Sequence, residues 1–353
     1  SSAASDVYKR QDNIHRGYSV ANSLRKIKEA GFIPDVICAH PGWGEALFVK
    51  TVFPNAKLVC YQEYYYQSSG SDVDFDPEYP PASNDYQFTT QLRNSTILQS
   101  LAHADFNISP TEWQRAQFPD IFKERISVLH DGIDTQLVKP DDQAFIQLNK
   151  YNIRLTKKDD VITFVNRNLE PYRGFHIFMR SLPELLRSKP NAHVLIVGGD
   201  EVSYGRKLPN GQTYKQKYIE ELGHKIDMNR VHFVGRVPYN IFINILQISS
   251  VHVYLTYPFV LSWSLLEAMS AGCAIVASAT KPVMEVIRDK KNGFLVDFFS
   301  PEEIVKSTLE ILEHPDRMAS IRSNARQYVI ENYDLHSKCL PAHLELIKKI
   351  ARS

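Results

Sequence analysis

Residues 161–174 read VITFVNRNLEPYRG, and this stretch decides the fold of the second half of the chain. Val161–Val165 is a short run rich in β-branched and aromatic residues, which predicts a buried strand. A tight connection with two arginines follows, and a helix is expected from about residue 175 to 188. A buried strand that turns directly into a helix is the repeating element of a doubly wound parallel sheet.

The same alternation of strands and helices continues on both sides of this stretch. Downstream we expect strands at 192–197, 231–234, 251–255, 274–277 and 293–296, separated by helices near 213–224, 238–248, 262–271, 282–290 and 301–313. Upstream we expect strands at 35–39, 57–61, 105–109 and 126–129, with helices near 18–30, 46–52, 86–102 and 111–117. The pattern predicts an α/β protein with two Rossmann-like doubly wound domains that face each other across a cleft.

The length of 353 residues, 43% of them hydrophobic, suits two cores of this kind. We place the N-terminal domain at 12–155 and the C-terminal domain at 156–330. The polar segment 130–160 is interpreted as the connection between them. Residues 331–353 are expected to form a C-terminal helix that packs back on the N-terminal domain.

The first eleven residues, SSAASDVYKRQ, are left out of these assignments. The part DVYKRQ looks like the translation of a transposon end used in sequencing libraries, so we expect either an artefact or a disordered tail. We therefore expect the natural chain to begin upstream of residue 12.

Charge and cysteine content narrow the functional classes. The net charge of +1 gives no basic field for nucleic acid. The four cysteines are scattered, as expected for free thiols in a reducing compartment. We predict a cytoplasmic protein, and contact with the inner face of a membrane stays open because the final helix carries Lys348, Lys349 and Arg352 on an amphipathic pattern.

Two arginines in the opening stretch are the first candidates for chemistry. Arg167 and Arg173 lie six residues apart at the carboxyl end of the predicted strand. Both can converge on one anion there, since guanidinium groups and helix N-terminal amides both suit phosphate oxygens. Two solvated loop arginines are the structural alternative.

Two further segments carry candidate binding residues. Glu267 lies on a mostly apolar helix that Ser262 is expected to cap, so its carboxylate needs a partner. A ribose diol and a neighbouring amide or arginine are equally acceptable partners on spacing alone. Gly235, Arg236 and Val237 follow a strand, and their backbone can read a nucleobase.

Taken together, these segments resemble the retaining glycosyltransferases of family 4, which have the GT-B fold. Arg167 and Arg173 match that family's R-x5-K-G diphosphate motif, with Arg173 in place of the lysine. Glu267 matches the second glutamate of its E-x7-E motif, which implies contact with the donor ribose. Phe259 stands where the first glutamate should be, which puts recognition of the donor sugar in doubt.

Other segments extend the resemblance to a bacterial subgroup of that family. They are the HPGWGE segment (40–45), the FDPEYP segment (75–80), SVLHDGID (127–134) and GGDEVSYG (198–205). The resemblance implies substrate-binding roles for the backbone of Val260, Leu261 and Ser262 and for Asp200. The family usually carries a histidine near the donor's anomeric carbon after the strand 57–61, where this sequence has Gln62 and Glu63 instead, so Glu63 is expected to take a polar or electrostatic role in the cleft. His40 follows the strand 35–39, and we expect it to line the acceptor side.

A metal site is not expected. Asp72, Asp74 and Asp76 alternate as in a D-x-D motif, but they lie in a loop with prolines and do not end an apolar strand. The sequence also lacks the glycine-rich fingerprint of a dinucleotide fold. We therefore expect no cofactor, with a nucleoside-diphosphate sugar as the donor substrate.

The resemblance implies that the protein transfers a sugar to a hydroxyl group of an acceptor, which is a sugar, a lipid-linked molecule or a glycan. It also implies that the reaction retains the anomeric configuration and needs no metal. The expected role is polysaccharide or glycoconjugate synthesis. Two alternatives stay open. One is a sugar-nucleotide epimerase of the same fold, and the other is a catalytically silent nucleotide-binding module.

Overall fold

The structure is a computed structural model that describes residues 2–81, 85–149 and 152–352. It divides into two compact units, which we describe separately. Unit 1 comprises residues 1–132 and 336–353, and unit 2 comprises residues 133–335.

Unit 1 is built on a four-stranded parallel sheet in the order β1-β2-β3-β4. Its strands are Val36–Ala39, Lys57–Tyr61, Phe106–Ser109 and Ile126–Val128. The helices of this unit are α1 (Ser2–Glu29), α2 (Val49–Val52), α3 (Tyr86–His103), α4 (Glu112–Ala116), α5 (Asp120–Lys123) and α13 (Leu340–Ala351). Each strand is short. The central strands β2 and β3 are mostly buried, as is typical of parallel sheets, whereas the edge strand β1 is partly exposed at Cys38.

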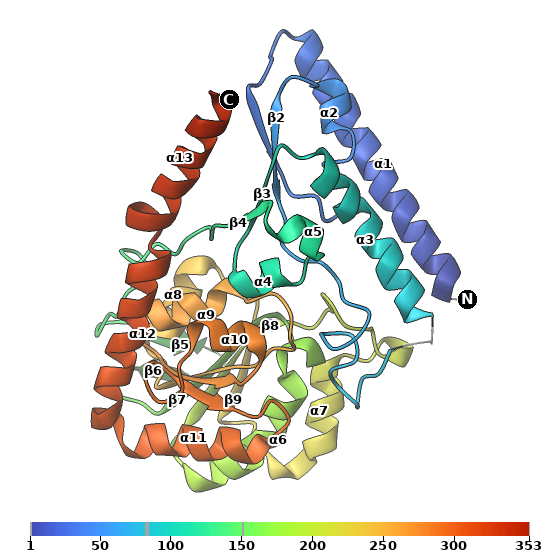
Figure 1. Cartoon of the computed structure of the whole chain (residues 1–353). Coiled ribbons are helices and arrows are strands. Elements are labelled where there is room, and N and C mark those ends of the chain that lie inside the picture. The colour runs from blue at the N-terminus through green and yellow to red at the C-terminus, as the bar shows by residue number, and fades with distance from the viewer. Residues whose placement is uncertain (1, 82–84, 150–151, 353) are drawn as a thin grey trace. The chain divides into compact units, whose positions relative to one another are not determined.

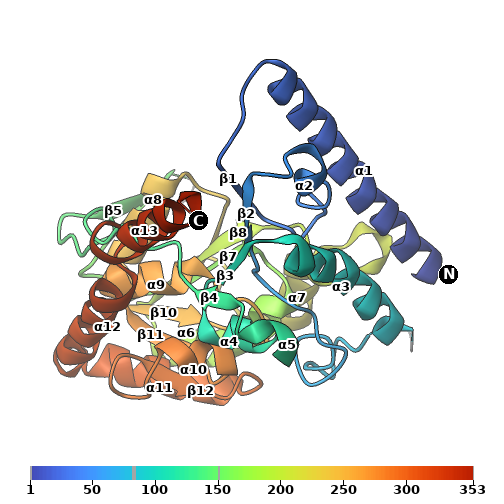
Figure 2. The same cartoon turned by 45° about the horizontal axis from the view of Figure 1, so that its top comes forward.

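The alternating side chains of β2 show how the two faces are covered. Leu58 and Cys60 point to the face on which α1 and α2 pack. Val59 points to the opposite face, where it meets Ile350 of α13. Figures 1 and 2 show α1, α2 and α3 on one side of this sheet and α13 on the other. The C-terminal helix therefore belongs to the core of unit 1.

Unit 2 contains a six-stranded parallel sheet in the order β12-β11-β10-β7-β8-β9. In chain order its strands are β7 (Val161–Asn168), β8 (His193–Gly199), β9 (Val231–Gly235), β10 (Val251–Tyr254), β11 (Ala274–Ser278) and β12 (Phe294–Val296). The chain winds from β7 to β9 in one direction and then returns to the other side of β7. The order therefore reverses between β7 and β10, which is the topological switch point of the sheet.

Helices cover both faces of this sheet. They are α6 (Phe175–Ser188), α7 (Tyr214–Leu222), α8 (Tyr239–Gln247), α9 (Trp263–Ser270), α10 (Lys281–Val286), α11 (Pro301–Glu313) and α12 (Met318–Tyr333). On one face Phe164 of β7 stacks on Phe178 of α6, with ring centroids 4.4 Å apart. On the other face α8, α9, α10 and α12 enclose one continuous apolar core.

The segment predicted as a polar connection contains a hairpin instead. Strands β5 (Phe145–Leu148) and β6 (Ile153–Thr156) pair antiparallel. Val138, Ile146 and Leu155 are buried in the same core as the helices of unit 2. The boundary between the units therefore lies at residue 132, not at 155, because these apolar side chains draw residues 133–156 into the second core.

The N-terminus also differs from the prediction. Residues 2–11 are not a disordered tail, because they continue the helix that was expected only from residue 18. No glycine or proline occurs between Ser2 and Arg16, so nothing in that stretch interrupts the backbone of a helix. At the other end, the expected final helix is α13 joined to α12 by a π-turn at Leu335–Cys339.

Among the described residues, none of the helices combines the length and the apolar character that crossing a bilayer requires.

Candidate functional site

The switch point of unit 2 is where an α/β sheet of this kind binds its ligand. Three connections leave the carboxyl ends of neighbouring strands there, namely 169–174 after β7, 200–206 after β8 and 255–262 after β10. Helix α9 begins directly after the last of them. We call these segments the switch-point site.

Arg173 is the central charged group of this site. Its side chain is only 6% exposed. Nη1 donates to Thr256 Oγ1 at 2.8 Å, to the Val260 carbonyl at 3.0 Å and to Tyr254 Oη at 3.5 Å. Within the described part of the chain no carboxylate lies within ion-pair distance of it. The guanidinium is therefore buried among neutral acceptors, and its charge has no counter-ion among the residues that the structure describes.

The backbone after Arg173 explains its position. Gly174 has a φ of +67°, a left-handed conformation that glycine adopts without strain. A Cβ atom at this position would lie 2.3 Å from Cβ of Leu255. The connection after β7 is therefore in close contact with the connection after β10, which brings Arg173 to Thr256 and Val260.

Arg167 lies at the carboxyl end of β7 as predicted, but its surroundings differ from those of Arg173. Its side chain is exposed. It makes no hydrogen bond or ion pair to any residue that the structure describes. Only Arg173 is built into the site, and Arg167 stays available at the end of β7.

The start of α9 departs from the expected cap. Ser262 occupies the N-cap position, but its hydroxyl accepts no backbone amide of the helix and instead hydrogen-bonds to Ser264 Oγ at 2.9 Å. The Ser262 amide donates to Tyr254 Oη at 2.9 Å. Val260 gives its carbonyl to Arg173, and the side chains of Val260 and Leu261 are buried. Two of the backbone groups predicted to contact a sugar are therefore engaged within the protein.

Phe259 is 3% exposed and lies in an aromatic cluster. Its ring meets Tyr204 edge-on at 4.9 Å between centroids and Tyr172 at 5.6 Å. The Arg173 guanidinium lies 5.9 Å from the Phe259 ring and 5.4 Å from the Tyr204 ring. Aromatic faces thus supply part of the environment of the buried cation.

Glu267 has a protein partner, which is neither a backbone amide nor an arginine. Tyr239 Oη donates to Glu267 Oε1 at 2.7 Å. Burial raises the pKa of the Glu267 carboxyl, and the hydrogen bond from Tyr239 partly opposes that shift. Glu267 is half-buried, so its second oxygen can accept from a ligand hydroxyl.

The remaining predicted residues of unit 2 lie at its carboxyl edge. Gly235 ends β9 with a φ of +71°, and a Cβ there would meet open space. Arg236 is exposed and bonds Asn168 Oδ1 at 3.0 Å and Glu201 Oε2 at 2.7 Å. Asp200 pairs with Lys215 at 3.5 Å. Val237 is half-buried beside them.

Glu170 is a residue of the site that sequence reasoning did not single out. Its carboxylate is 1% exposed and accepts from the backbone amides of Ser203, Tyr204 and Gly205 at 2.8–3.3 Å. A glutamate before a proline in a loop is ordinarily solvated. Its burial arises only when the connection after β8 folds onto it, which no local signal reveals.

Unit 1 carries its own polar pocket at the carboxyl ends of β1 and β2. Gly42 donates its amide to His40 Nδ1 at 3.2 Å, so His40 carries its proton on Nε2 and donates to Glu63 Oε2 at 3.3 Å. Trp43 stacks on the imidazole with centroids 4.8 Å apart. Both predicted residues therefore lie in one pocket, which also includes Tyr61, Gln62 and Tyr64.

The aspartate-rich loop of unit 1 makes protein contacts. Asp72 accepts from Tyr64 Oη at 3.2 Å, and Asp74 accepts from the Gly70 amide at 2.9 Å. Asp76 accepts from the Glu78 amide at 2.9 Å. Among the described residues no group of three or more His, Cys, Asp or Glu side chains is placed to hold a metal ion.

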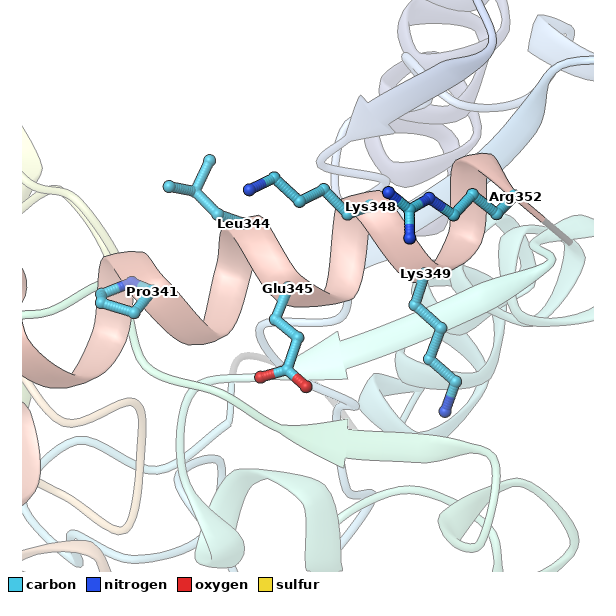
Figure 3. Close-up of a pocket in the computed structure, with 6 residues that line it drawn as sticks. All are labelled: Pro341, Leu344, Glu345, Lys348, Lys349 and Arg352. Atoms are coloured by element: carbon cyan, nitrogen blue, oxygen red, sulfur yellow. The ribbon is translucent and has the colours of Figure 1, made fainter.

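Helix α13 presents a basic face away from its buried Ile350. Figure 3 shows Pro341, Leu344, Glu345, Lys348, Lys349 and Arg352 along the exposed side of this helix. Lys348, Lys349 and Arg352 lie on its last turns beside the exposed Leu344.

Two family models match the chain. Residues 3–138 match the Glycosyl transferase family 4 group, and residues 146–328 match Glycosyl transferases group 1. The second match covers more than half of the 353 residues. The chain belongs to the group 1 glycosyltransferases.

Curated relatives of this glycosyltransferase are distant. An uncharacterised glycosyltransferase of Methanocaldococcus jannaschii is 27% identical over 59% of the chain and 49% of its own length. A D-inositol 3-phosphate glycosyltransferase of Segniliparus rotundus is 24% identical over 63% of the chain and 48% of its own length. The chain thus spans about half the length of these relatives. A probable sucrose-phosphate synthase of Thermosipho melanesiensis is 21% identical over 94% of the chain and 74% of its own length.

Solved structures show the same fold. Sucrose-phosphate synthase of Thermosynechococcus elongatus superimposes with a TM-score of 0.70 and 20% identity, over 93% of this chain and 77% of that one. HepE of Anabaena, solved with UDP-glucose, gives a TM-score of 0.67 and 18% identity over 93% and 82%. The fold of this glycosyltransferase is therefore GT-B, with two Rossmann-like α/β units, as predicted.

Proposed function

We propose that this glycosyltransferase binds a nucleoside-diphosphate sugar at the switch-point site of unit 2 and transfers the sugar to an acceptor hydroxyl. The observation that carries the proposal is Arg173, a buried guanidinium without a carboxylate partner. Burying an unpaired charge costs several kcal/mol unless a ligand of opposite charge completes the site. A diphosphate supplies that charge and accepts hydrogen bonds from Nε and Nη2 of Arg173, which have no acceptor among the described residues.

Two neighbouring groups fit the same ligand. Arg167 is exposed and makes no hydrogen bond or ion pair to a residue that the structure describes, so its guanidinium is available to a phosphate oxygen. Helix α9 starts directly after the Val260 carbonyl that anchors Arg173, and helix N-terminal amides attract phosphate.

The nucleoside would bind on the α9 and β9 side of these cations. Glu267 would accept from a ribose hydroxyl through the oxygen that is not bonded to Tyr239. The open backbone at Gly235 to Val237 would read the base. Asp200 lies directly after β8 and pairs with Lys215, so it would contribute to donor binding by positioning that lysine.

Unit 1 would supply the acceptor side. His40 and Glu63 share a pocket with Trp43 and Tyr61, which suits a ligand that has hydroxyl groups and an apolar ring face. A sugar, lipid-linked or glycan hydroxyl is such a ligand. The relatives support this class, since TarM of S. aureus has been solved with UDP and alpha-GlcNAc-glycerol.

In the proposed reaction the bond between the anomeric carbon and the diphosphate oxygen breaks, and its electron pair stays on the diphosphate. The acceptor oxygen bonds to the anomeric carbon, and its proton passes to the departing diphosphate. Arg167 and Arg173 would stabilise the developing charge by preorganised electrostatics, without a metal. We propose retention of configuration and a role in polysaccharide or glycoconjugate synthesis on the strength of the family alone.

The proposed function is tested by nucleotide release. The protein is incubated with UDP-, GDP- and ADP-glucose, with and without glucose or glycerol as acceptor, and both nucleotide and glycoside are measured. We expect a glycoside with one donor, and at least tenfold slower turnover for Arg167→Ala. Free nucleotide without glycoside would favour the epimerase, and nucleotide binding without any product would favour the silent module.

We further propose a cytoplasmic protein whose α13 touches an anionic membrane surface. The proposal rests on the exposed Lys348, Lys349 and Arg352 beside Leu344 (Figure 3), a composition that suits the headgroup region.

A further inference from the structure

An aromatic surface, which we call the aromatic wall, lies at the switch-point site. It consists of Tyr204 from the connection after β8 and of Phe259, which packs behind it. Tyr204 is the residue of this connection with an exposed ring, since 40% of it is open to solvent. Its ring is backed by Phe259 at 4.9 Å and faces the Arg173 guanidinium at 5.4 Å. An exposed aromatic surface therefore lies beside the buried cation.

Glu170 holds this wall in place. Its two carboxylate oxygens accept four hydrogen bonds from three successive amides, those of Ser203, Tyr204 and Gly205, at 2.8–3.3 Å. Asn168 adds a bond from Nδ2 to Ser203 Oγ at 2.7 Å. Asn168 is the last residue of β7, and Glu170 lies in the connection that also carries Arg173. The cation and the aromatic wall are thus fixed to one short segment of backbone.

The carboxylates of the connections around Tyr204 already have protein partners: Asp200 pairs with Lys215 and Glu201 with Arg236. Phe259 stands at the position where a glutamate was expected, and it is buried beneath Tyr204. Both oxygens of the Glu170 carboxylate accept hydrogen bonds from backbone amides. The surface that Tyr204 itself offers to a ligand is the apolar face of its exposed ring.

We propose that Tyr204 is the donor-sugar platform of this protein and that Glu170 is its positioning residue. The inference rests on the proposed function, because it assumes that Arg173 binds the diphosphate. One side of a diphosphate carries the nucleoside, which we place toward Glu267, and the other side carries the sugar. The sugar then stacks its C–H face on the Tyr204 ring, with Phe259 fixing the orientation of that ring.

The test compares donors with and without their sugar. Dissociation constants are measured calorimetrically for UDP and UDP-glucose, GDP and GDP-mannose, and ADP and ADP-glucose. For the pair that binds, we expect Tyr204→Ala to weaken the sugar nucleotide about tenfold, equal to about 1.4 kcal/mol. We expect the same variant to change the dissociation constant of the nucleoside diphosphate by no more than about twofold.

Two further variants separate positioning from folding. Glu170→Gln replaces one acceptor oxygen by an amide that cannot accept from the backbone, so it should reproduce the selective loss while UDP, GDP or ADP binding persists. Phe145→Ala removes a comparably exposed ring from the β5–β6 hairpin and should change neither constant.

The outcomes are distinct. Equal weakening of both ligands by Tyr204→Ala would overturn the sugar platform and place the ring beside the nucleoside. Unchanged binding of both would overturn it as well. If the parent protein binds no nucleotide of any pair, the proposed function itself fails, which is a different result.

Discussion

Nη1 of Arg173 donates to the backbone carbonyl of Val260 at 3.0 Å, and this bond joins the two connections that meet at the switch point of unit 2. One residue thereby anchors the start of α9 and presents a positive charge without a carboxylate partner. The placement follows from the doubly wound topology, because the chain reverses between β7 and β10.

The close approach at Gly174 predicts a large effect of a single methyl group. Gly174→Ala should lower the free energy of unfolding by about 2 kcal/mol or more, because the new Cβ would clash with Leu255 in a left-handed backbone. Gly235→Ala has a similar φ but open space, so its cost should be about 1 kcal/mol. Urea unfolding measures both, and equal losses would show that the contact with Leu255 is absent.

We expect Glu267 to contribute to nucleotide binding but not to the stability of the folded protein. Burial raises the pKa of its carboxyl, so its negative charge destabilises the folded state once the pH exceeds that pKa. Wild-type stability therefore falls as the pH rises from the ordinary carboxyl pKa through the raised one.

Glu267→Gln removes this charge, so its melting temperature relative to the parent should be higher at pH 7 than at pH 4. Its stabilisation by nucleotide should be smaller at the same time. The exposed Glu310→Gln on α11 is the matched control and should change neither quantity. A difference that shrinks as the pH rises would contradict the raised pKa.

Buried histidines predict acid sensitivity in unit 2. Burial lowers the pKa of His252 to about 3 and that of His232 to about 4. The unfolded chain binds these protons near pH 6.5, so stability should be lost as the pH falls from about 6.5 toward 4. His252→Leu should lose less melting temperature between pH 7 and pH 5 than the parent does. The exposed His224→Leu should follow the parent, and identical slopes for all three proteins would refute the assignment.

The basic face of α13 predicts vesicle binding. Combined replacement of Lys348, Lys349 and Arg352 by glutamate should abolish co-sedimentation with phosphatidylserine vesicles, since each basic side chain near such a surface contributes about 1 kcal/mol. Glutamates at the exposed Lys225, Lys306 and Arg317 of unit 2 are the charge-matched control. Equal sedimentation of the two variants would exclude α13 as the contact.

The sequence predicted most of this architecture because parallel α/β units carry strong local signals. The strand from Val161 and the helix that ends at Glu313 were both expected from runs of apolar residues and from their periodicity. The β5–β6 hairpin was missed, because its short alternating strands lie between polar residues. Because the hairpin packs in the core of unit 2, the boundary between the units lies at residue 132 and not at 155.

The site was predicted only as far as local patterns reach. Arg167, Arg173, His40 and Glu63 were named from their places at the ends of strands, and the structure sets them at carboxyl edges. Glu267 was named from its place on an apolar helix, and it lies in α9. Other features of the site arise from contacts between residues distant in sequence. They are the burial of Arg173, the hydrogen bond from Tyr239 to Glu267 and the hydrogen bond from the Tyr204 amide to Glu170. No pattern within a single element encodes them.

The central claim is that Arg173 provides the charge for a nucleoside diphosphate. The most direct measurement is thermal melting of the parent protein, Arg173→Ala and Arg167→Ala, each with UDP, GDP and ADP added separately. We predict that one nucleotide raises the melting temperature of the parent, since a ligand of the native state stabilises by mass action. Arg173→Ala should lose the rise, and the exposed Arg167→Ala, which should fold like the parent, should show a smaller one. A full rise in both variants, or no rise in the parent with any of the three nucleotides, would contradict the account.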